Sequence, residues 1–228
     1  MREVNQLFNP QIVNHKDVID KLVIESSPRR TFLTMILISS VLATLGLLND
    51  SSSIVIGAML VSPLLWSVLG ISMGMIVGDF RMVKLASVSI LFSVFVAVIT
   101  AIAITFFYIP LGASTEILRQ TNFGFMIPVA IAAGAAAAFA MSYETIKEAV
   151  TGVAISVALL PPLVTIGIGL GGTDWSLMRD ATELFFINLF GIILTAFVIF
   201  WLLGFRRHHH ELRSAVDKEE KVLKGNKK

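Results

Sequence analysis

The chain offers few side chains that could catalyse a reaction. It contains no cysteine among its 228 residues, which excludes thiol nucleophiles, disulfides and zinc–thiolate sites. No HExxH motif, GxSxG motif or glycine-rich phosphate loop occurs. Asp79, Glu144 and Glu148 could act on lipid at the cytoplasmic face only if they converged on a metal ion; the alternative is that Lys147 and solvent neutralise them. We therefore expect neither an enzyme nor a bound metal or cofactor.

Three consecutive histidines, His208–His210, follow the last apolar stretch. Neutral imidazole is a common transition-metal ligand, so this run could bind a metal if it met other ligands. The alternative, which we favour, is a partly solvated segment at the membrane interface. The basic residues after the histidine run do not by themselves indicate a nucleic-acid partner.

Prolines inside two apolar stretches suggest a different chemistry, based on backbone groups. Pro63 lies within Val61–Leu64, and Pro161 and Pro162 lie within Leu160–Leu163. Proline removes one helical hydrogen bond and kinks or breaks the helix. In hydrocarbon the freed backbone groups need polar partners, so such breaks favour a binding site near mid-membrane. The alternative is a pair of kinked helices packed without any ligand.

Neutral polar residues near these breaks complete the candidate pathway. An unpaired amide in hydrocarbon is costly, so we expect Asn188 to point into the bundle, toward the breaks or into a hydrogen bond that serves packing alone. No ionisable side chain lies deep in any apolar stretch, which disfavours proton pumps and voltage sensors and leaves Na⁺ coupling or none. The predicted substrate or ion pathway contains Ser62, Pro63, Ser156, Pro161, Pro162, Thr165 and Asn188.

Composition and patterning predict the elements that position these residues. The chain is 55% hydrophobic and only 15% charged, and its apolar stretches each approach the roughly 20 residues that cross a bilayer. We predict an all-α membrane bundle over 31–205, after an amphipathic cytoplasmic segment (1–30) and before a basic cytoplasmic tail (206–228) that extends the last helix. The six predicted spans are Thr31–Leu48, Ser53–Val77, Val83–Ile109, Asn122–Met141, Ala149–Leu170 and Glu183–Phe205.

Basic residues predict the orientation in the cell membrane. If the N-terminus is cytoplasmic, all of the 18 lysines and arginines except Arg119 and Arg179 fall on the cytoplasmic side. Cytoplasmic segments of membrane proteins are enriched in these residues. We therefore expect both termini in the cytoplasm.

The two halves of the chain have similar patterns. A shift of about 99 residues places Pro63 on Pro162 and Gly70 on Gly169. Because each half has three spans, the second half would enter the membrane from the opposite side, which gives inverted repeats with proline-broken middle helices.

Small residues predict close helix packing. Gly70, Gly74 and Gly78 recur every four residues, and Gly134 lies in an alanine-rich stretch. Small residues allow membrane helices to approach closely, although pore lining is an alternative. We also expect the bundle to form a homo-oligomer in the lipid bilayer.

Several motifs resemble the DUF389 family of bacterial and archaeal membrane proteins. They are Glu25–Pro28, Ala43–Asn49, Val55–Leu64, Gly70 with Gly78–Asp79, Gly152–Leu163, and Asn188 with Gly191. The resemblance covers roughly residues 20 to 200 and implies the membrane fold; it implies no substrate. Many relatives carry a soluble N-terminal domain, so this chain is expected to be a short form.

Together these features predict a transporter or channel-like permease for a small solute or ion. The alternative is a structural or regulatory membrane subunit without a pathway, whose tails bind a partner.

Overall fold

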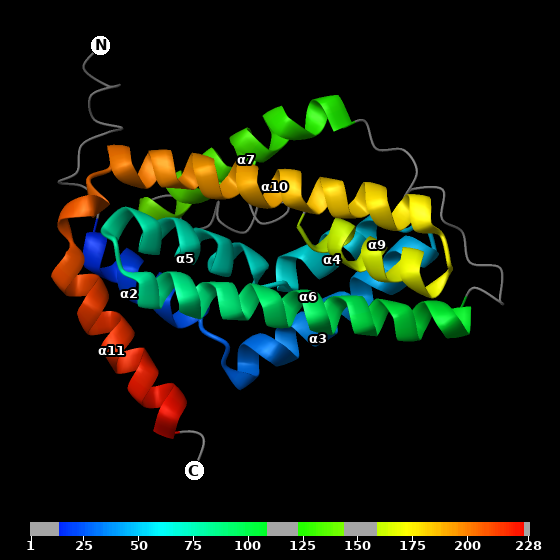
Figure 1. Cartoon of the computed structure of the whole chain (residues 1–228), viewed down its shortest axis with the longest axis horizontal. Coiled ribbons are helices and arrows are strands. Elements are labelled where there is room, and N and C mark those ends of the chain that lie inside the picture. The colour runs from blue at the N-terminus through cyan, green and yellow to red at the C-terminus, as the bar shows by residue number, and fades with distance from the viewer. Residues whose placement is uncertain (1–13, 109–122, 144–158, 226–228) are drawn as a thin grey trace.

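The computed structural model describes residues 14–108, 123–143 and 159–225. Within these ranges every regular element is a helix (Figure 1). Our predictions for Ser156, Arg119, Glu144, Lys147 and Glu148, and for the first part of the fifth span, lie outside them. The elements are α2 (His15–Glu25), α3 (Arg30–Leu48), α4 (Ser52–Val61), α5 (Leu64–Val77), α6 (Phe80–Tyr108), α7 (Phe123–Ser142), α9 (Leu160–Gly171), α10 (Trp175–Leu202), the 3₁₀ turn η4 (Phe205–Arg207) and α11 (His209–Gly225).

Three helices of the described chain, α3, α6 and α10, are long and apolar enough to cross a membrane. The pair α4 and α5 meets the same test when taken together, although its two parts are bent by 47°. The Ile127–Ser142 part of α7 and the helix α9 are shorter and also apolar. These properties agree with a helical membrane protein.

The last apolar helix begins earlier than predicted. α10 starts at Trp175 instead of Glu183, because the Asp174 side chain accepts a hydrogen bond from Leu177 N and caps the helix there. The predicted span excluded the first turns of α10 because they contain charged residues. They remain outside the core, since the Arg179 side chain is 73% exposed.

The C-terminal segment also differs from the prediction. It does not continue α10: Gly204 adopts a positive φ of 82°, η4 follows, and α11 turns away from α10 (Figure 1). α11 packs against α2, with Leu212, Ala215 and Val216 buried. The predicted amphipathic N-terminal helix is present as α2, so the two terminal helices form one layer at one end of the bundle.

Three turns between antiparallel helices share one geometry. In each turn, the residue four positions after a glycine has a positive φ (48°, 75° or 57°). The N–H of the residue that follows it donates to the carbonyl of that glycine, at 2.8–3.0 Å. A Cβ on that glycine would lie 2.8–3.0 Å from a backbone nitrogen of the next helix, so only glycine allows this approach. The turns contain Gly46–Asp50–Ser51, Gly74–Gly78–Asp79 and Gly169–Thr173–Asp174.

These turns correct one packing prediction. Gly74 lies at a helix contact, because a Cβ there would meet Val83, and Gly70 lies against Ser26 and Met82. Gly78 is different: it ends α5 with φ of 75° and makes the turn instead of lining a helix face. Gly134 lies against the backbone of Ile192, where α7 and α10 cross.

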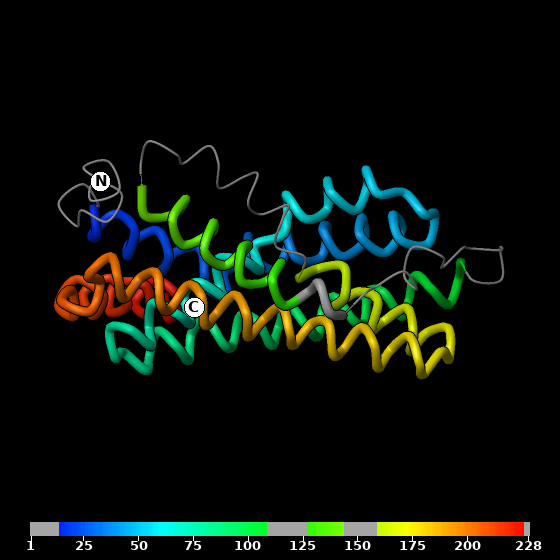
Figure 2. The backbone as a smooth tube through the Cα atoms, turned by 90° about the horizontal axis from the view of Figure 1, so that it is seen from above, coloured from blue at the N-terminus to red at the C-terminus, as the bar shows by residue number. Residues whose placement is uncertain are grey.

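Helices far apart in sequence bury matching positions. α10 buries Leu177, Ala181, Phe185, Asn188, Ile192, Ala196 and Phe200; subtracting 95 gives Met82, Ala86, Ile90, Ser93, Ala97, Ala101 and Thr105, all buried in α6. The buried positions of α5 and α9 match at a similar shift, and those of α3 and α7 match at a shift of 94. The colours of Figures 1 and 2 show α6 and α10 running in opposite directions. The matching register is therefore four residues shorter than the predicted shift of 99.

Candidate pathway at the helix breaks

The break between α4 and α5 is local and follows from Pro63. The residue before a proline is disfavoured in the helical region, and Ser62 is extended, with φ −71° and ψ 126°. Ser62 N still donates to the carbonyls of Ala58 and Met59, and Ser62 Oγ lies 3.5 Å from Leu64 N. The break therefore leaves the N-terminal end of α5 with few hydrogen-bond partners.

The two sides of this break differ in burial. Leu60, at the carbonyl end of α4, is 42% exposed, whereas Leu64, which begins α5, is 3% exposed. α5 packs against α6 and α10. The amide end of the break thus faces the protein interior, and the carbonyl end lies toward the periphery.

The second proline site lies at the start of a helix. Pro161 and Pro162 lie in the first turn of α9, where a missing N–H breaks no helical bond. The prediction placed them inside the span Ala149–Leu170, whose first part lies outside the described residues; α9 begins at Leu160. Thr165 Oγ1 donates to the Pro161 carbonyl at 2.8 Å, so this hydroxyl is used within the helix.

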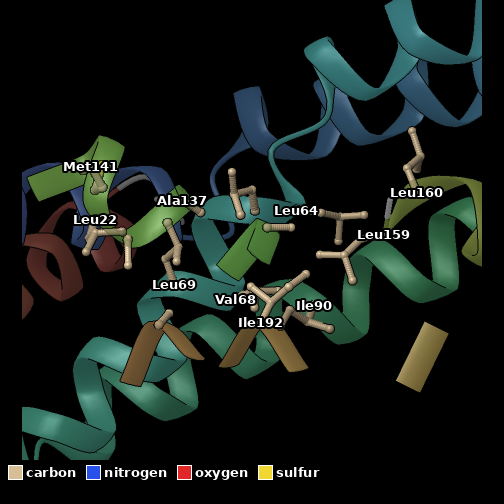
Figure 3. Packing of buried hydrophobic residues seen from close by; sticks show 14 of the residues in the cluster. Leu22, Leu64, Val68, Leu69, Ile90, Ala137, Met141, Leu159, Leu160 and Ile192 are labelled. Carbon is tan, nitrogen blue, oxygen red and sulfur yellow. The ribbon is translucent and has the colours of Figure 1, made fainter. Parts of the chain in front are cut away.

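The structure brings these two ends toward the same region. Figures 1 and 2 both place the beginnings of α5 and α9 toward the middle of the long axis. Leu64, Leu159 and Leu160 belong to one cluster of buried apolar side chains (Figure 3). α10 packs against both α5 and α9 and carries Asn188, which is 3% exposed. Ser156 lies outside the described residues.

Ser67 is a polar residue that sequence reasoning left out of the predicted pathway. It lies in the first turn of α5 and is fully buried, and no hydrogen-bond partner for its Oγ occurs among the described residues. The sequence contains many serines in apolar stretches, so nothing distinguishes Ser67 by type. Its place four residues after Pro63 was the available signal.

Of the three acidic residues considered for metal binding, the structure describes Asp79, because Glu144 and Glu148 lie outside the described residues. Asp79 Oδ1 accepts a hydrogen bond from Arg81 N at 2.9 Å, and Oδ2 lies 3.3 Å from the Arg81 guanidinium. The described part of the chain contains no group of three or more potential metal ligands. Asp79 therefore serves to cap α6.

Ion pairs attach α11 to the bundle. The Arg29 guanidinium makes two hydrogen bonds to Glu219, one of them 2.6 Å from Nε to Oε1, and Arg81 also pairs with Asp217. The Glu219 side chain is only 3% exposed. Its hydrogen bonds raise the pKa of Arg29 above its ordinary value, so the guanidinium stays charged throughout the physiological range.

The histidine run meets α2 at the corner between α10 and α11. The His208 ring stacks on His15 at 4.2 Å between centroids, and His15 Nε2 lies 3.0 Å from the Leu203 carbonyl oxygen. His209 and His210 are exposed.

Apolar helices of spanning length and a broken helix pair indicate a helical membrane protein. A family model described as "Domain of unknown function (DUF389)" matches residues 59–194, which contain both proline sites. The chain belongs to the DUF389 family. It is 30% identical over 174 residues to an uncharacterized protein of Methanocaldococcus jannaschii, an alignment that covers 75% of this chain and 54% of that protein. The chain thus spans about half the length of that relative. No solved structure matches it.

Proposed function

We propose that this chain is a membrane permease for a small solute or ion, with its pathway at the starts of α5 and α9. The observation that carries the proposal is the Ser62–Pro63 break, which leaves the amide end of α5 in the protein interior. A helix end buried without partners is unfavourable unless something polar meets it. A pathway for a polar solute supplies that partner.

Matching burial supports an architecture of two inverted three-span repeats. α3 and α7, α5 and α9, and α6 and α10 bury equivalent positions, and the members of the first and last pairs run in opposite directions (Figures 1 and 2). Transporters with inverted repeats bind substrates near mid-membrane at discontinuous helices. In this proposal the chain crosses the membrane six times.

Charge distribution supports cytoplasmic termini in the cell membrane. The described basic residues of α2, the start of α3, the start of α6 and α11 lie at one end, where both terminal helices pack (Figure 1). Arg179 is the described basic residue in the first turns of α10, at the opposite end. This asymmetry follows the enrichment of lysine and arginine on the cytoplasmic side.

Exposed apolar side chains support contact with lipid or another copy of the chain. Leu91 and Phe95 of α6 are exposed, as are Phe190 and Leu194 of α10. Such residues are unfavourable in water and suit hydrocarbon or a homo-oligomer interface.

Solute flux into liposomes containing the purified full chain tests the permease proposal. Asn188→Ala should reduce flux, because it removes a buried amide from the helix between the two breaks. Asn49→Ala is the matched control, since Asn49 is exposed and its Nδ2 bonds to the Leu45 carbonyl. If correctly folded wild-type protein passes no ion or neutral solute, the role of a non-transporting subunit replaces this proposal.

A further inference from the structure

We propose that the first turn of α5 binds a small monovalent anion, which deepens the permease proposal by naming its substrate class. A buried hydrogen-bond donor lies there without an acceptor among the described residues: Ser67 Oγ–H. An anion accepts hydrogen bonds and donates none, so it satisfies this hydroxyl. Helix N-termini bind anions through the amides of their first turn.

Ser67 differs from most buried hydroxyls of the described bundle; Thr105 Oγ1, near the far end of α6, also has no hydrogen-bond partner among the described residues. Ser40 and Ser93 donate to the carbonyl four residues earlier in their own helices, at 2.6 and 2.8 Å. The corresponding carbonyl for Ser67 is that of Pro63, which already accepts from Trp66 N at 3.2 Å. Side chains of a helix incline toward its N-terminus, so the Ser67 hydroxyl is directed toward the free end of α5.

The charge distribution in the interior favours a negative ligand. The positive ends of two helix dipoles, those of α5 and α9, lie toward the middle of the molecule. The buried carboxylates of the described chain, Asp79 and Glu219, belong to the end where α2 and α11 pack, and both pair with arginines. Neither buried carboxylate therefore lies at the break to repel an anion or attract a cation.

Proline gives the two helix ends different roles. α9 has prolines at two positions of its first turn, so it supplies few amide donors and contributes mainly its dipole. α5 begins after its proline and keeps its amides. The ligand is thus assigned to α5, and α9 adds favourable potential from the other repeat.

A cation is disfavoured by the position of the carbonyl groups. The free carbonyls at this break belong to the end of α4, where Leu60 and Val61 are exposed.

The surroundings predict selectivity among anions. Leu64, Leu159 and Leu160 are buried around these helix ends. Lys21 is the basic residue that contacts this turn, with Nζ 4.9 Å from the centroid of the Trp66 ring. One lysine beside an apolar lining does not offset the large desolvation cost of a divalent anion. We expect weakly hydrated monovalent anions such as nitrate and iodide to bind better than fluoride or sulfate.

Flux in liposomes tests transport of these anions. Vesicles that contain the full chain and a halide-quenched dye should take up iodide faster than fluoride, with a potassium ionophore to balance charge. Ser67→Ala should lower the rate about tenfold or more, because a hydrogen bond to a charged group is lost. Ser67→Thr should retain flux, and Ser40→Ala is the matched control. Passage of only cations or neutral solutes would overturn the anion assignment and leave the permease proposal intact.

Binding provides a readout that does not depend on transport. In detergent, nitrate should raise the thermal unfolding temperature of wild-type protein relative to gluconate at equal ionic strength, because a ligand of the folded state stabilises it. Ser67→Ala should lose this shift and Ser40→Ala should keep it. Equal shifts in both variants would overturn the site, whereas a specific shift without any flux would support the anion site and contradict the permease proposal.

Discussion

Asp79 and Asp174 begin α6 and α10 in the same way, 95 residues apart in the sequence. Asp79 Oδ1 accepts from Arg81 N at 2.9 Å, and Asp174 Oδ1 accepts from Leu177 N at 3.0 Å. Each aspartate's own N–H donates to the carbonyl of a glycine five residues earlier. The two longest helices of the described chain therefore start from equivalent caps.

Removing either cap should destabilise the protein. Asp79→Ala and Asp174→Ala should each lower the free energy of unfolding by about 1 kcal/mol, the usual effect of losing a helix cap. Asn should substitute well at 174, because its amide oxygen also caps. At 79 it should be worse, since the ion pair with Arg81 is lost. Unfolding in mixed detergent micelles measures these differences, and equal effects of Asn at both positions would contradict the role of the ion pair.

Glycine substitutions should separate helix contacts from open surface. A Cβ at Gly167 would lie 2.5 Å from Ala101 Cβ and 2.6 Å from the Val98 carbonyl oxygen. Gly167→Ala should therefore force α6 and α9 apart and cost about 1–3 kcal/mol, as overpacking does. Gly57→Ala is the matched control inside α4, with no atom within 4 Å of the new Cβ, and should be neutral or stabilise by up to about 1 kcal/mol. Thermal unfolding of both variants measures these changes in stability. A Gly167→Ala variant as stable as the wild type would argue against this contact.

Much of the fold could be predicted from the sequence because apolar length is a strong signal. α3 and α6 begin within a few residues of their predicted starts, and the break at Pro63 follows from the geometry of proline itself. Helix ends that depend on a single capping side chain were harder to predict from the sequence. Asp174 moved the start of α10 by eight residues, and no pattern of hydrophobicity indicates a cap of this kind.

The matching burial of the two halves and the candidate site were less accessible to sequence reasoning. Proline and glycine matches favoured a shift of 99, but Pro63 precedes its helix whereas Pro162 lies within the first turn of α9. Burial favours a shift of 95 between α6 and α10, because it reports which helix face packs. Ser67 stood out only once the partners of the other hydroxyls were known, since a missing hydrogen bond is a property of three-dimensional structure.

The Arg29–Glu219 pair should hold α11 on the bundle. Arg29→Ala leaves the buried Glu219 carboxylate without its partner. Because the arginine is one-third exposed, the expected cost is about 1–3 kcal/mol, between the values for surface and buried pairs. Limited proteolysis should then cleave α11 faster, and Lys224→Ala, which removes an exposed surface pair with Glu220, should not change the rate.

The pH dependence of this attachment follows from the raised pKa of Arg29. A cation whose pKa is higher in the folded state contributes stability below its unfolded pKa and loses it as pH rises through the folded value. The Arg29 guanidinium therefore stays charged between pH 7 and 10, and its contribution to holding α11 on the bundle should not change in that interval. The cleavage rate of wild-type α11 is divided by that of the Arg29→Ala variant at each pH, which removes the pH dependence of the protease itself. A rise of this ratio between pH 7 and 10 would contradict the role of the pair.

Single cysteines should reveal the orientation, because the natural sequence contains none. Ser52 begins α4 at the end of the molecule away from the terminal helices, and Ser214 lies on α11; both are exposed. With cytoplasmic termini, Ser52→Cys should react with a membrane-impermeant maleimide on intact cells, whereas Ser214→Cys should react only after lysis. Serine-to-cysteine changes at exposed positions preserve size and disturb little packing, so both variants should fold. The reverse pattern would place both termini outside, and labelling of both sites in intact cells would contradict an end-to-end membrane crossing by α3.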